Sequence, residues 1–426
     1  MASLGWATPG YSAVEIQWWH AMSGRLGEKV KALAADFNGS QTQFKVVPTY
    51  KGSYSETVTA GIAAFRAKRH PHILQVYEVG TATMMAGGGA VKPVHELMTQ
   101  SGEPFDPEVF IPAVAGFYTT PKGEMLSLPF NSSTPVLYYN KEAFQKAGLN
   151  PDMPPATWPE VERYSEKLLQ AGYTCGFSTA WISWIHLENL GAWHNVPIGT
   201  RGNGFEGFDA RLTLDNPLHV KHLQQLADWQ KRGIFVYGGR RNLGNAKFSS
   251  GECPMYTESS AGYAGFKANA RFEFGVGQLP YWPDIKGAPQ NTIIGGASLW
   301  VLSGHAKVPY QGVAQFFSYL SSPDVQADWH QTTGYLPITR AAYEKSKADG
   351  FYEILPAAEI PIKQLTLNPP TRYSKGVRFH SMIQIRGVIY SALESVLSGK
   401  QKAKSALQGA MNRANRLLSR FQKNRR

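Results

Sequence analysis

The sequence predicts an α/β fold in which strands alternate with helices. Three observations predict it: the chain opens with a strand-helix-strand-helix-strand pattern, the alternation continues to the C-terminal part, and no repeat with a period of about 20–50 residues is present. The 426 residues are enough for about two to three domains of ordinary size. Solenoids, propellers and small disulfide-dependent scaffolds are therefore excluded.

The opening segment shows both hydrophobic periods clearly. Val14, Ile16 and Trp18 alternate as in a strand, and the apolar residues over 26–37 recur at helical spacing. The same criteria predict a strand over 44–50, a helix over 58–65 and a strand over 72–77. Strands joined by helices are parallel, and ligands bind beyond their carboxyl ends. We therefore expect Trp19, His20, Tyr54 and Glu78 in loops at one rim of the sheet.

A second α/β unit begins after Gly123. Short strands are predicted over 126–129 and 136–139, followed by a helix over 141–147. Thr157 and Glu160 predict a capping box at the start of a helix over 158–170. The remaining predicted elements are strands over 174–178, 253–256 and 274–278 and a helix over 217–232. No regular element is predicted for the aromatic stretch 181–197 or the glycine-rich stretch 199–207, because their periodicity is weak.

The positive charge of the chain is concentrated at its C-terminal end. The formal charge is +12, but nine basic and no acidic residues lie between Lys400 and Arg426, which leaves about +3 for the rest. This distribution does not predict a nucleic-acid groove. One helical stripe of the same segment carries Leu407, Met411, Ala414, Leu418 and Phe421, and another carries Arg413, Arg416 and Arg420. We expect this helix to dock on its own domain, with binding to an anionic membrane surface as the alternative.

Neither a membrane span nor a complete export signal is predicted. No run of about 18 apolar residues occurs. The first dozen residues lack the basic and apolar stretches of a secretory signal, so the signal is either removed or the protein is cytoplasmic. Cys175 and Cys253 are the only cysteines, and they form no C-x-x-C pair. One disulfide and two buried thiols both remain open at this point.

The motifs of enzymes are incomplete in this chain. Residues 202–207 satisfy G-x-G-x-x-G, but no strand precedes them and no helix follows. Residues 176–180 approach the nucleophile elbow G-x-S-x-G without its last glycine. His70 and His72 are two possible metal ligands without a third, and no Walker A sequence occurs. We therefore predict no catalytic residues, no metal and no cofactor.

Several segments resemble the extracellular solute-binding proteins of ABC importers, in particular the members that bind glycerol 3-phosphate. They are VPTYKGSY at 47–54, GIAAFRA at 61–67, ILQVYEVGTATMMA at 73–86, LPFNSSTPVLYYNKEAFQKAGL at 128–149, NTIIGGASLW at 291–300 and HQTTGYLPIT at 330–339. The last two are the most diagnostic, and the resemblance runs from about Val14 to Phe421. It implies a type II periplasmic binding protein fold, in which two lobes close on a ligand in the cleft between them.

The resemblance also implies how the chain is divided and what it does. We expect an N-terminal lobe built from residues 13–126 and 274–325 and a C-terminal lobe built from 127–273 and 326–426, ending in the basic helix. The expected protein is a periplasmic monomer that catalyses no reaction and binds no nucleic acid. It would deliver glycerol 3-phosphate, or a glycerophosphodiester such as glycerophosphocholine, to a cognate ABC permease.

The same resemblance implies a set of ligand contacts. They are Tyr54, Glu78, Ser133, Ser259, Gly296, Tyr335 and Arg386. Arg386 would pair with the phosphate, assisted by hydroxyl groups and the backbone N–H of Gly296, whereas Glu78 would accept from the glycerol hydroxyls and repel a misplaced phosphate. Trp158 and Trp184 are added because an indole can stack on an apolar or choline group, although both could instead be core residues.

Two other functions remain open. The 12% of aromatic residues suits a carbohydrate receptor of the same fold, which would not need Arg386. An enzyme that hydrolyses glycerophosphodiesters would need a metal cluster or an activated nucleophile, and the sequence offers neither.

Overall fold

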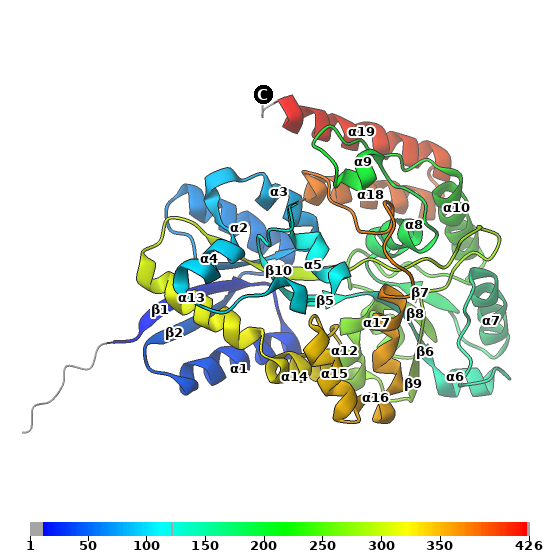
Figure 1. The fold of residues 1–426 in the computed structure, drawn as a ribbon. Coiled ribbons are helices and arrows are strands. Elements are labelled where there is room, and N and C mark those ends of the chain that lie inside the picture. Colours follow the sequence, from blue (N-terminus) through cyan, green and yellow to red (C-terminus); the bar gives the residue numbers. More distant parts are fainter. Residues whose placement is uncertain (1–11, 121, 424–426) are drawn as a thin grey trace, which may run out of the picture.

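Two β-sheets, each covered by helices, divide the molecule into two lobes that lie side by side (Figure 1). The computed structural model describes residues 12–120 and 122–423. Predictions for the first eleven residues and for the last three residues of the basic segment lie outside the described residues. The helices and strands alternate along the chain, which confirms the predicted α/β class.

The N-terminal lobe is built on a six-stranded sheet of order β2-β1-β3-β10-β4, with β5 paired to β10. Its strands are β1 (Val14–His20), β2 (Phe44–Tyr50), β3 (Ile73–Tyr77), β4 (Val91–Lys92), β5 (Leu128–Ser133) and β10 (Gly295–Leu302). Strand β1 runs parallel to β2 and β3, as predicted, whereas β10 is antiparallel to β3, β4 and β5. The helices of this lobe are α1 (Gly24–Ser40), α2 (Tyr54–Arg66), α3 (Thr81–Met85), α4 (Val94–Ser101), α5 (Pro112–Tyr118) and α13 (Lys307–Leu320).

The C-terminal lobe is built on a four-stranded sheet of order β7-β8-β6-β9. Its strands are β6 (Pro135–Asn140), β7 (Phe177–Thr179), β8 (Met255–Ser259) and β9 (Phe274–Gly277), and its helices include α6 (Lys141–Lys146), α7 (Trp158–Gln170), α10 (Pro217–Lys231), α11 (Asn245–Ser249) and α12 (Tyr263–Asn269). The capping box of α7 is present, because the Glu160 N–H donates to Thr157 Oγ1 and the Thr157 N–H donates to Glu160 Oε2. The start of α7 is therefore the one predicted.

The chain crosses between the lobes later than predicted. Strand β5 belongs to the first sheet, so the first crossing is at Thr134 rather than at 126/127. Strand β9 pairs with β6, so the second crossing lies within 278–294 rather than at 273/274. The third predicted boundary, at 325/326, is also early, because Trp329 packs against Phe130 in the core of the N-terminal lobe. Short apolar segments do not reveal which sheet they join, since strand pairing is non-local.

The aromatic stretch after β7 is helical, which the sequence did not predict. Residues Trp184–Asn189 form a π-helix, labelled η4, and continue into α8 (Leu190–Trp193). Every residue of both helices is buried, so no polar face marks a helical period. The glycine-rich stretch contains α9 (Thr200–Gly204), in which Arg201, Gly202 and Asn203 have positive φ. The four residues expected in loops also differ from the prediction: Trp19 and His20 lie within β1, Tyr54 begins α2, and Glu78 begins a short 3-10 helix.

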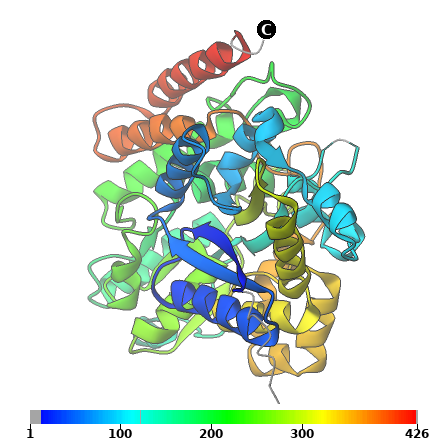
Figure 2. The same cartoon turned by 90° about the vertical axis from the view of Figure 1, so that its left-hand side faces the viewer.

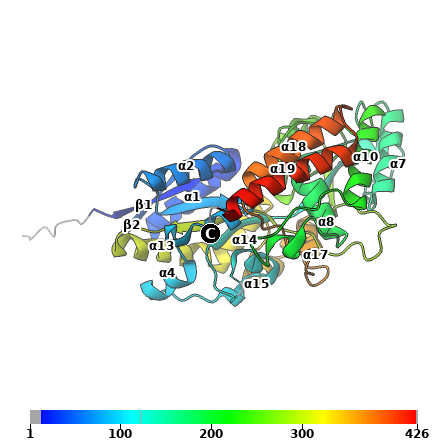
Figure 3. The ribbon, with the colours of Figure 1, turned by 90° about the horizontal axis from the view of Figure 1, so that it is seen from above.

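The last part of the chain packs across both lobes. Its helices are α14 (Pro323–Thr333), α15 (Arg340–Ala348), α16 (Phe351–Ile354), α17 (Ile360–Leu365), α18 (Met382–Leu397) and α19 (Ala403–Lys423). Helices α18 and α19 run side by side along one edge of the C-terminal lobe (Figures 2 and 3). Helix α19 buries Leu407, Ala414 and Leu418 and exposes Arg413 and Arg416, which confirms docking on its own domain. No helix among the described residues is long and apolar enough to span a bilayer.

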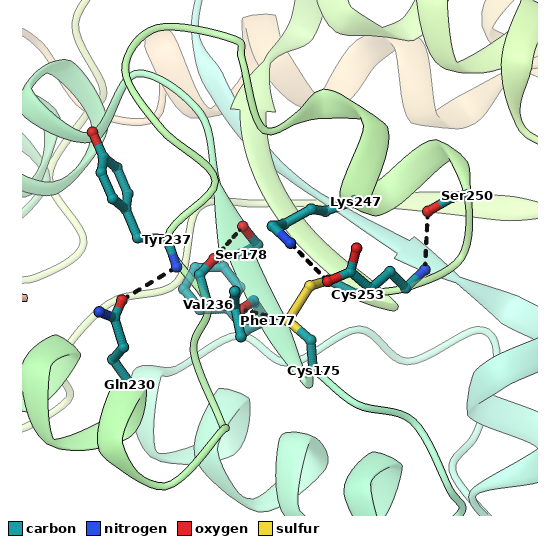
Figure 4. Close-up of a disulfide and its surroundings, with 10 residues drawn as sticks. Cys175, Phe177, Ser178, Gln230, Val236, Tyr237, Lys247, Ser250 and Cys253 are labelled. Carbon is teal, nitrogen blue, oxygen red and sulfur yellow. Dashed lines mark hydrogen bonds and ion pairs between the residues drawn. A yellow bond between two sulfur atoms is a disulfide. The ribbon is translucent and has the colours of Figure 1, made fainter.

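A disulfide joins Cys175 to Cys253, which settles the alternative left open by the sequence (Figure 4). Cys175 lies just before β7 and Cys253 just before β8, and these two strands pair in parallel. Both half-cystines are fully buried. The bridge therefore ties the starts of two neighbouring strands in the C-terminal sheet.

Replacing both half-cystines, as Cys175→Ala/Cys253→Ala, is expected to lower the free energy of unfolding by about 2–4 kcal/mol, because the unfolded chain gains conformational freedom. Chemical denaturation of the wild type and the double variant measures this difference. Ligand affinity should be unchanged, since neither cysteine lines the cavity described below. Equal denaturation midpoints would contradict the prediction.

Candidate ligand-binding site

A small cavity lies between the two lobes, at the ends of strands from both sheets. Its lining residues are Tyr54, Tyr77, Glu78, Ser133, Trp181, Trp184, Ser259, Gly295, Gly296, Tyr335 and Arg386. Its volume is about 70 Å³. All the contact residues predicted from the sequence line it, except Trp158.

Trp158 belongs to the core of the C-terminal lobe. It is the first residue of α7, is 1% exposed, and packs against the rings of Phe177, His186 and His222. A side chain held there cannot stack on a ligand in the cavity. The prediction for Trp158 is therefore wrong, and the alternative reading as a core residue is correct.

Arg386 is bound by two carboxylates at the floor of the cavity. On α18, its Nε and Nη2 donate to Glu188 of η4 at 2.8 and 2.7 Å. Nη2 also lies 2.7 Å from Glu78 Oε1, which follows β3 in the N-terminal lobe. The ion pair with Glu188 stays within the C-terminal lobe, whereas the ion pair with Glu78 connects the lobes.

This arrangement fixes the charge of the arginine and leaves one nitrogen available. Burial alone would lower the pKa of Arg386, but the carboxylates of Glu188 and Glu78 raise it well above its ordinary value. Burial also raises the pKa of Glu78, against the opposing effect of Arg386. The Nη1 group makes no hydrogen bond or ion pair to any residue between 12 and 423 that the structure describes. Its two N–H groups can therefore serve a ligand.

Hydroxyl and backbone donors converge on the same cavity from the strand ends. Ser133 ends β5, Ser259 ends β8, and Gly296 lies opposite Ser132 where β10 begins. Gly296 has φ of +104°, and a Cβ there would lie 1.9 Å from the carbonyl oxygen of Asn131. Only glycine fits, so the backbone itself borders the cavity at this position.

The aromatic walls are held rigidly from behind. Tyr54 stacks on Tyr77 with ring centroids 5.2 Å apart, and its hydroxyl accepts a hydrogen bond from Asn131 Nδ2. Tyr335 stacks on Trp329 with centroids 5.7 Å apart. Burial raises the pKa of both Tyr54 and Tyr335, so both hydroxyls remain neutral near neutral pH. Because the two hydroxyls also hydrogen-bond to each other, the pair can offer one O–H to an anion without carrying charge.

The sequence of this chain matches the family model described as bacterial extracellular solute-binding protein over residues 32–354. It is 50% identical over 421 residues to the sn-glycerol-3-phosphate-binding periplasmic protein UgpB of Yersinia pseudotuberculosis, covering 99% of this chain and 96% of that protein. The UgpB protein of Pectobacterium atrosepticum is 51% identical over 412 residues, covering 96% of this chain and 93% of that protein. The chain belongs to the bacterial extracellular solute-binding proteins.

Solved structures of solute-binding proteins share the fold. UgpB of Mycobacterium tuberculosis, in complex with glycerophosphocholine, superposes with a TM-score of 0.80 at 22% identity, over 96% of this chain and 99% of that chain. The GacH receptor of Streptomyces glaucescens gives a TM-score of 0.79 at 19% identity, over 96% of this chain and 99% of that one. These similarities confirm the predicted two-lobed, type II periplasmic binding protein fold.

Sequence reasoning missed four residues at or behind the cavity of this solute-binding protein. Tyr77, Trp181 and Gly295 line it, and Glu188 holds Arg386 from behind. Gly295 could have been suspected from the sequence, because it adjoins Gly296. In the structure, a Cβ at Gly295 would come within 2.5 Å of the Trp184 ring. Trp181 and Glu188 gave no signal, since they belong to the stretch without recognisable periodicity.

A larger groove of about 1030 Å³ also separates the lobes, between α5 and the segments 204–208 and 370–380. Arg378 borders it, donates to the carbonyls of Phe117 and Thr119, and packs on the Phe205 ring. None of the predicted contact residues lies there. Charged groups line this groove too, among them Glu206, Lys375 and Arg378. The smaller cavity is the better candidate for a small polar ligand, because all but one of the predicted contact residues converge on it. Within the described ranges, no group of three or more His, Cys, Asp and Glu side chains is arranged to hold a metal ion.

Proposed function

We propose that this protein is the periplasmic receptor of an ABC importer and that it binds glycerol 3-phosphate. The observation that carries the proposal is the cavity itself: a fixed guanidinium, whose Nη1 group has no partner among the described residues, shares about 70 Å³ with hydroxyl donors and a carboxylate. Two relatives of half-identical sequence are glycerol-3-phosphate-binding periplasmic proteins, which supports both the ligand and the location. We further propose that the receptor acts as a monomer with a cognate permease and catalyses no reaction.

The two ends of the ligand would be recognised by different chemistry. The phosphate needs several donors, which Arg386 Nη1, Ser133, Ser259 and the backbone at Gly296 can supply. One arginine between two carboxylates gives this cluster a net negative charge when both are ionised, so hydroxyl and N–H donors must carry much of the phosphate binding. Glu78 would accept from the glycerol hydroxyls and repel a phosphate placed at its end.

A glycerophosphodiester such as glycerophosphocholine is the second candidate ligand. Trp181 and Trp184 border the cavity and could face a trimethylammonium group, which aromatic faces bind well. The choline group adds volume beyond the phosphate, and the cavity is small. We therefore expect glycerophosphocholine to require more movement of these walls than glycerol 3-phosphate does.

A thermal-shift screen confirmed by titration calorimetry tests the function. Glycerol 3-phosphate at a hundredfold excess over its dissociation constant should stabilise the protein by about 2.7 kcal/mol, because only the folded state binds. Maltose and inorganic phosphate are the comparison ligands. A shift with maltose and none with millimolar glycerol 3-phosphate would identify a carbohydrate receptor instead. Release of free choline from glycerophosphocholine would identify an enzyme.

A further inference from the structure

Glu258 is a buried carboxyl group directly behind the proposed ligand site. It precedes Ser259 on β8, is 2% exposed, and lies beside an apolar cluster that contains Tyr138, Phe248 and Phe266. Its Oε1 accepts from the Ser259 N–H at 2.6 Å, whereas no described donor reaches Oε2 at hydrogen-bond distance. No lysine or arginine in the described ranges forms an ion pair with it. The side chain therefore has the surroundings of a neutral acid.

Glu258 adjoins two residues that line the cavity. The Ser259 N–H and the nearby side chains of Asn245 and Trp181 favour its charged form, but burial outweighs them. The ionisable groups that face it are the hydroxyls of Tyr138 on β6, Tyr256 on β8 and Tyr335 in the cavity wall. None of these is a cation, and burial raises the pKa of Glu258 to about 8. The carboxyl group is thus mostly protonated near neutral pH.

We propose that Glu258 is a positioning residue whose neutral form holds the backbone at Ser259 for an anionic ligand, and whose ionised form opposes that ligand. The inference rests on the proposed function, since a neutral ligand would not sense this charge. An unpaired carboxylate in apolar surroundings is poorly screened, so it would repel a phosphate held by the adjacent Ser259. The expected consequence is a loss of affinity as the pH rises above neutrality.

Apart from Glu78, the ligand and the other ionisable groups of the site keep a nearly constant charge above about pH 7.5. The second ionisation of a phosphomonoester lies near pH 6, so the ligand charge is nearly constant above about pH 7.5. Burial keeps the hydroxyls of Tyr54 and Tyr335 neutral, and Arg386 stays charged. Glu78 is the remaining carboxyl group that faces the cavity, and its pKa is also raised. The experiment must therefore separate Glu258 from Glu78.

To separate Glu258 from Glu78, we would measure the affinity for glycerol 3-phosphate by calorimetry at about pH 7 and about pH 9.5. The proteins compared are the wild type, Glu258→Gln and Glu252→Gln. The wild type should bind about tenfold more weakly at the higher pH, a usual size for coupling between sites. Glu258→Gln keeps a neutral side chain and should lose this dependence while binding well at pH 7. Glu252→Gln, an exposed neighbour paired with Lys247, should behave like the wild type.

A wild-type affinity that is the same at both pH values would overturn the proposal. A loss of affinity at the higher pH that persists in full in Glu258→Gln would also overturn it and would point to Glu78. If Glu258→Gln does not fold, wild-type calorimetry in buffers of different ionisation enthalpy decides instead: binding near pH 8 should take up protons, and no uptake would overturn the proposal. Absence of binding by the wild type at both pH values would overturn the proposed function itself, and this inference with it.

Discussion

Replacing Arg386 by alanine is expected to abolish measurable ligand binding and to lower the free energy of unfolding by about 3–5 kcal/mol. The variant leaves the buried carboxylates of Glu78 and Glu188 without their cation. It also removes the only guanidinium that lines the cavity among the described residues. Calorimetry with glycerol 3-phosphate measures the first effect, and chemical denaturation measures the second.

Arg240→Ala is the matched control for this experiment. Arg240 also binds a glutamate of α18, Glu394, but this pair is substantially exposed. Removing an exposed pair typically changes stability by less than about 1 kcal/mol, and the ligand site should be unaffected. Arg386→Lys keeps a charge but loses the planar fork that grips Glu188, so it should bind far more weakly than the wild type. Full affinity in Arg386→Ala would favour the carbohydrate receptor instead.

Acidification from about pH 7 to about pH 5 is expected to destabilise the protein strongly, because the C-terminal lobe buries neutral histidines. Burial lowers the pKa of His186 to about 3 and those of His194 and His219 to about 4. The pKa of His222 is lowered well below its ordinary value, by burial and by its neighbour His186. The unfolded chain takes up protons below about pH 6.5 while the folded chain does not, so stability falls as the pH drops.

The hydrogen bonds explain why these rings remain neutral. His222 Nδ1 accepts from Trp282 Nε1 at 3.1 Å, which leaves its Nε2–H to donate to His186 Nδ1 at 2.8 Å. His186 then donates from Nε2 to Thr179 Oγ1 at 3.0 Å. An additional proton on either imidazole would have no acceptor within this series of hydrogen bonds. At about 1.4 kcal/mol per pH unit, each such histidine contributes about 2 kcal/mol of the loss at pH 5.

Denaturant titrations at a series of pH values, with NMR of the imidazole nitrogens, check this prediction. The free energy of unfolding should decline steadily below about pH 6.5, and the buried rings should remain neutral in the folded protein at pH 5. Imidazoles that titrate near pH 6.5 in the folded state, or a free energy that does not change, would contradict it.

The sequence predicted those parts of the fold that depend on local patterns. The strand over 44–50 agrees with β2 at both ends, and the capping box located the start of α7. Lobe crossings were misplaced because they depend on which strand pairs with which, and pairing with β10 or β6 is not encoded near β5 or β9. The π-helix η4 was missed because all its residues are buried.

The candidate site shows the same division. The resemblance led to Arg386 and Glu78, but it did not show that Glu188 already occupies two nitrogens of the guanidinium. Trp158 was misjudged, although the sequence contained the answer: it lies on the same face of α7 as Val161 and Leu168, which are also buried. A tryptophan on an apolar helical stripe belongs to the core unless other evidence opposes it.

The unequal attachment of Arg386 determines what a parting of the two lobes would disrupt. The bidentate ion pair of Arg386 with Glu188 joins two segments of one lobe, so it would persist when the lobes separate. Of the two carboxylates, only Glu78 would lose Arg386 and become hydrated. The Arg386–Glu188 side of the pocket would thus stay assembled through repeated cycles of ligand binding and release. An incoming ligand would therefore find the Arg386 guanidinium already positioned on one lobe and the hydrated carboxylate of Glu78 on the other.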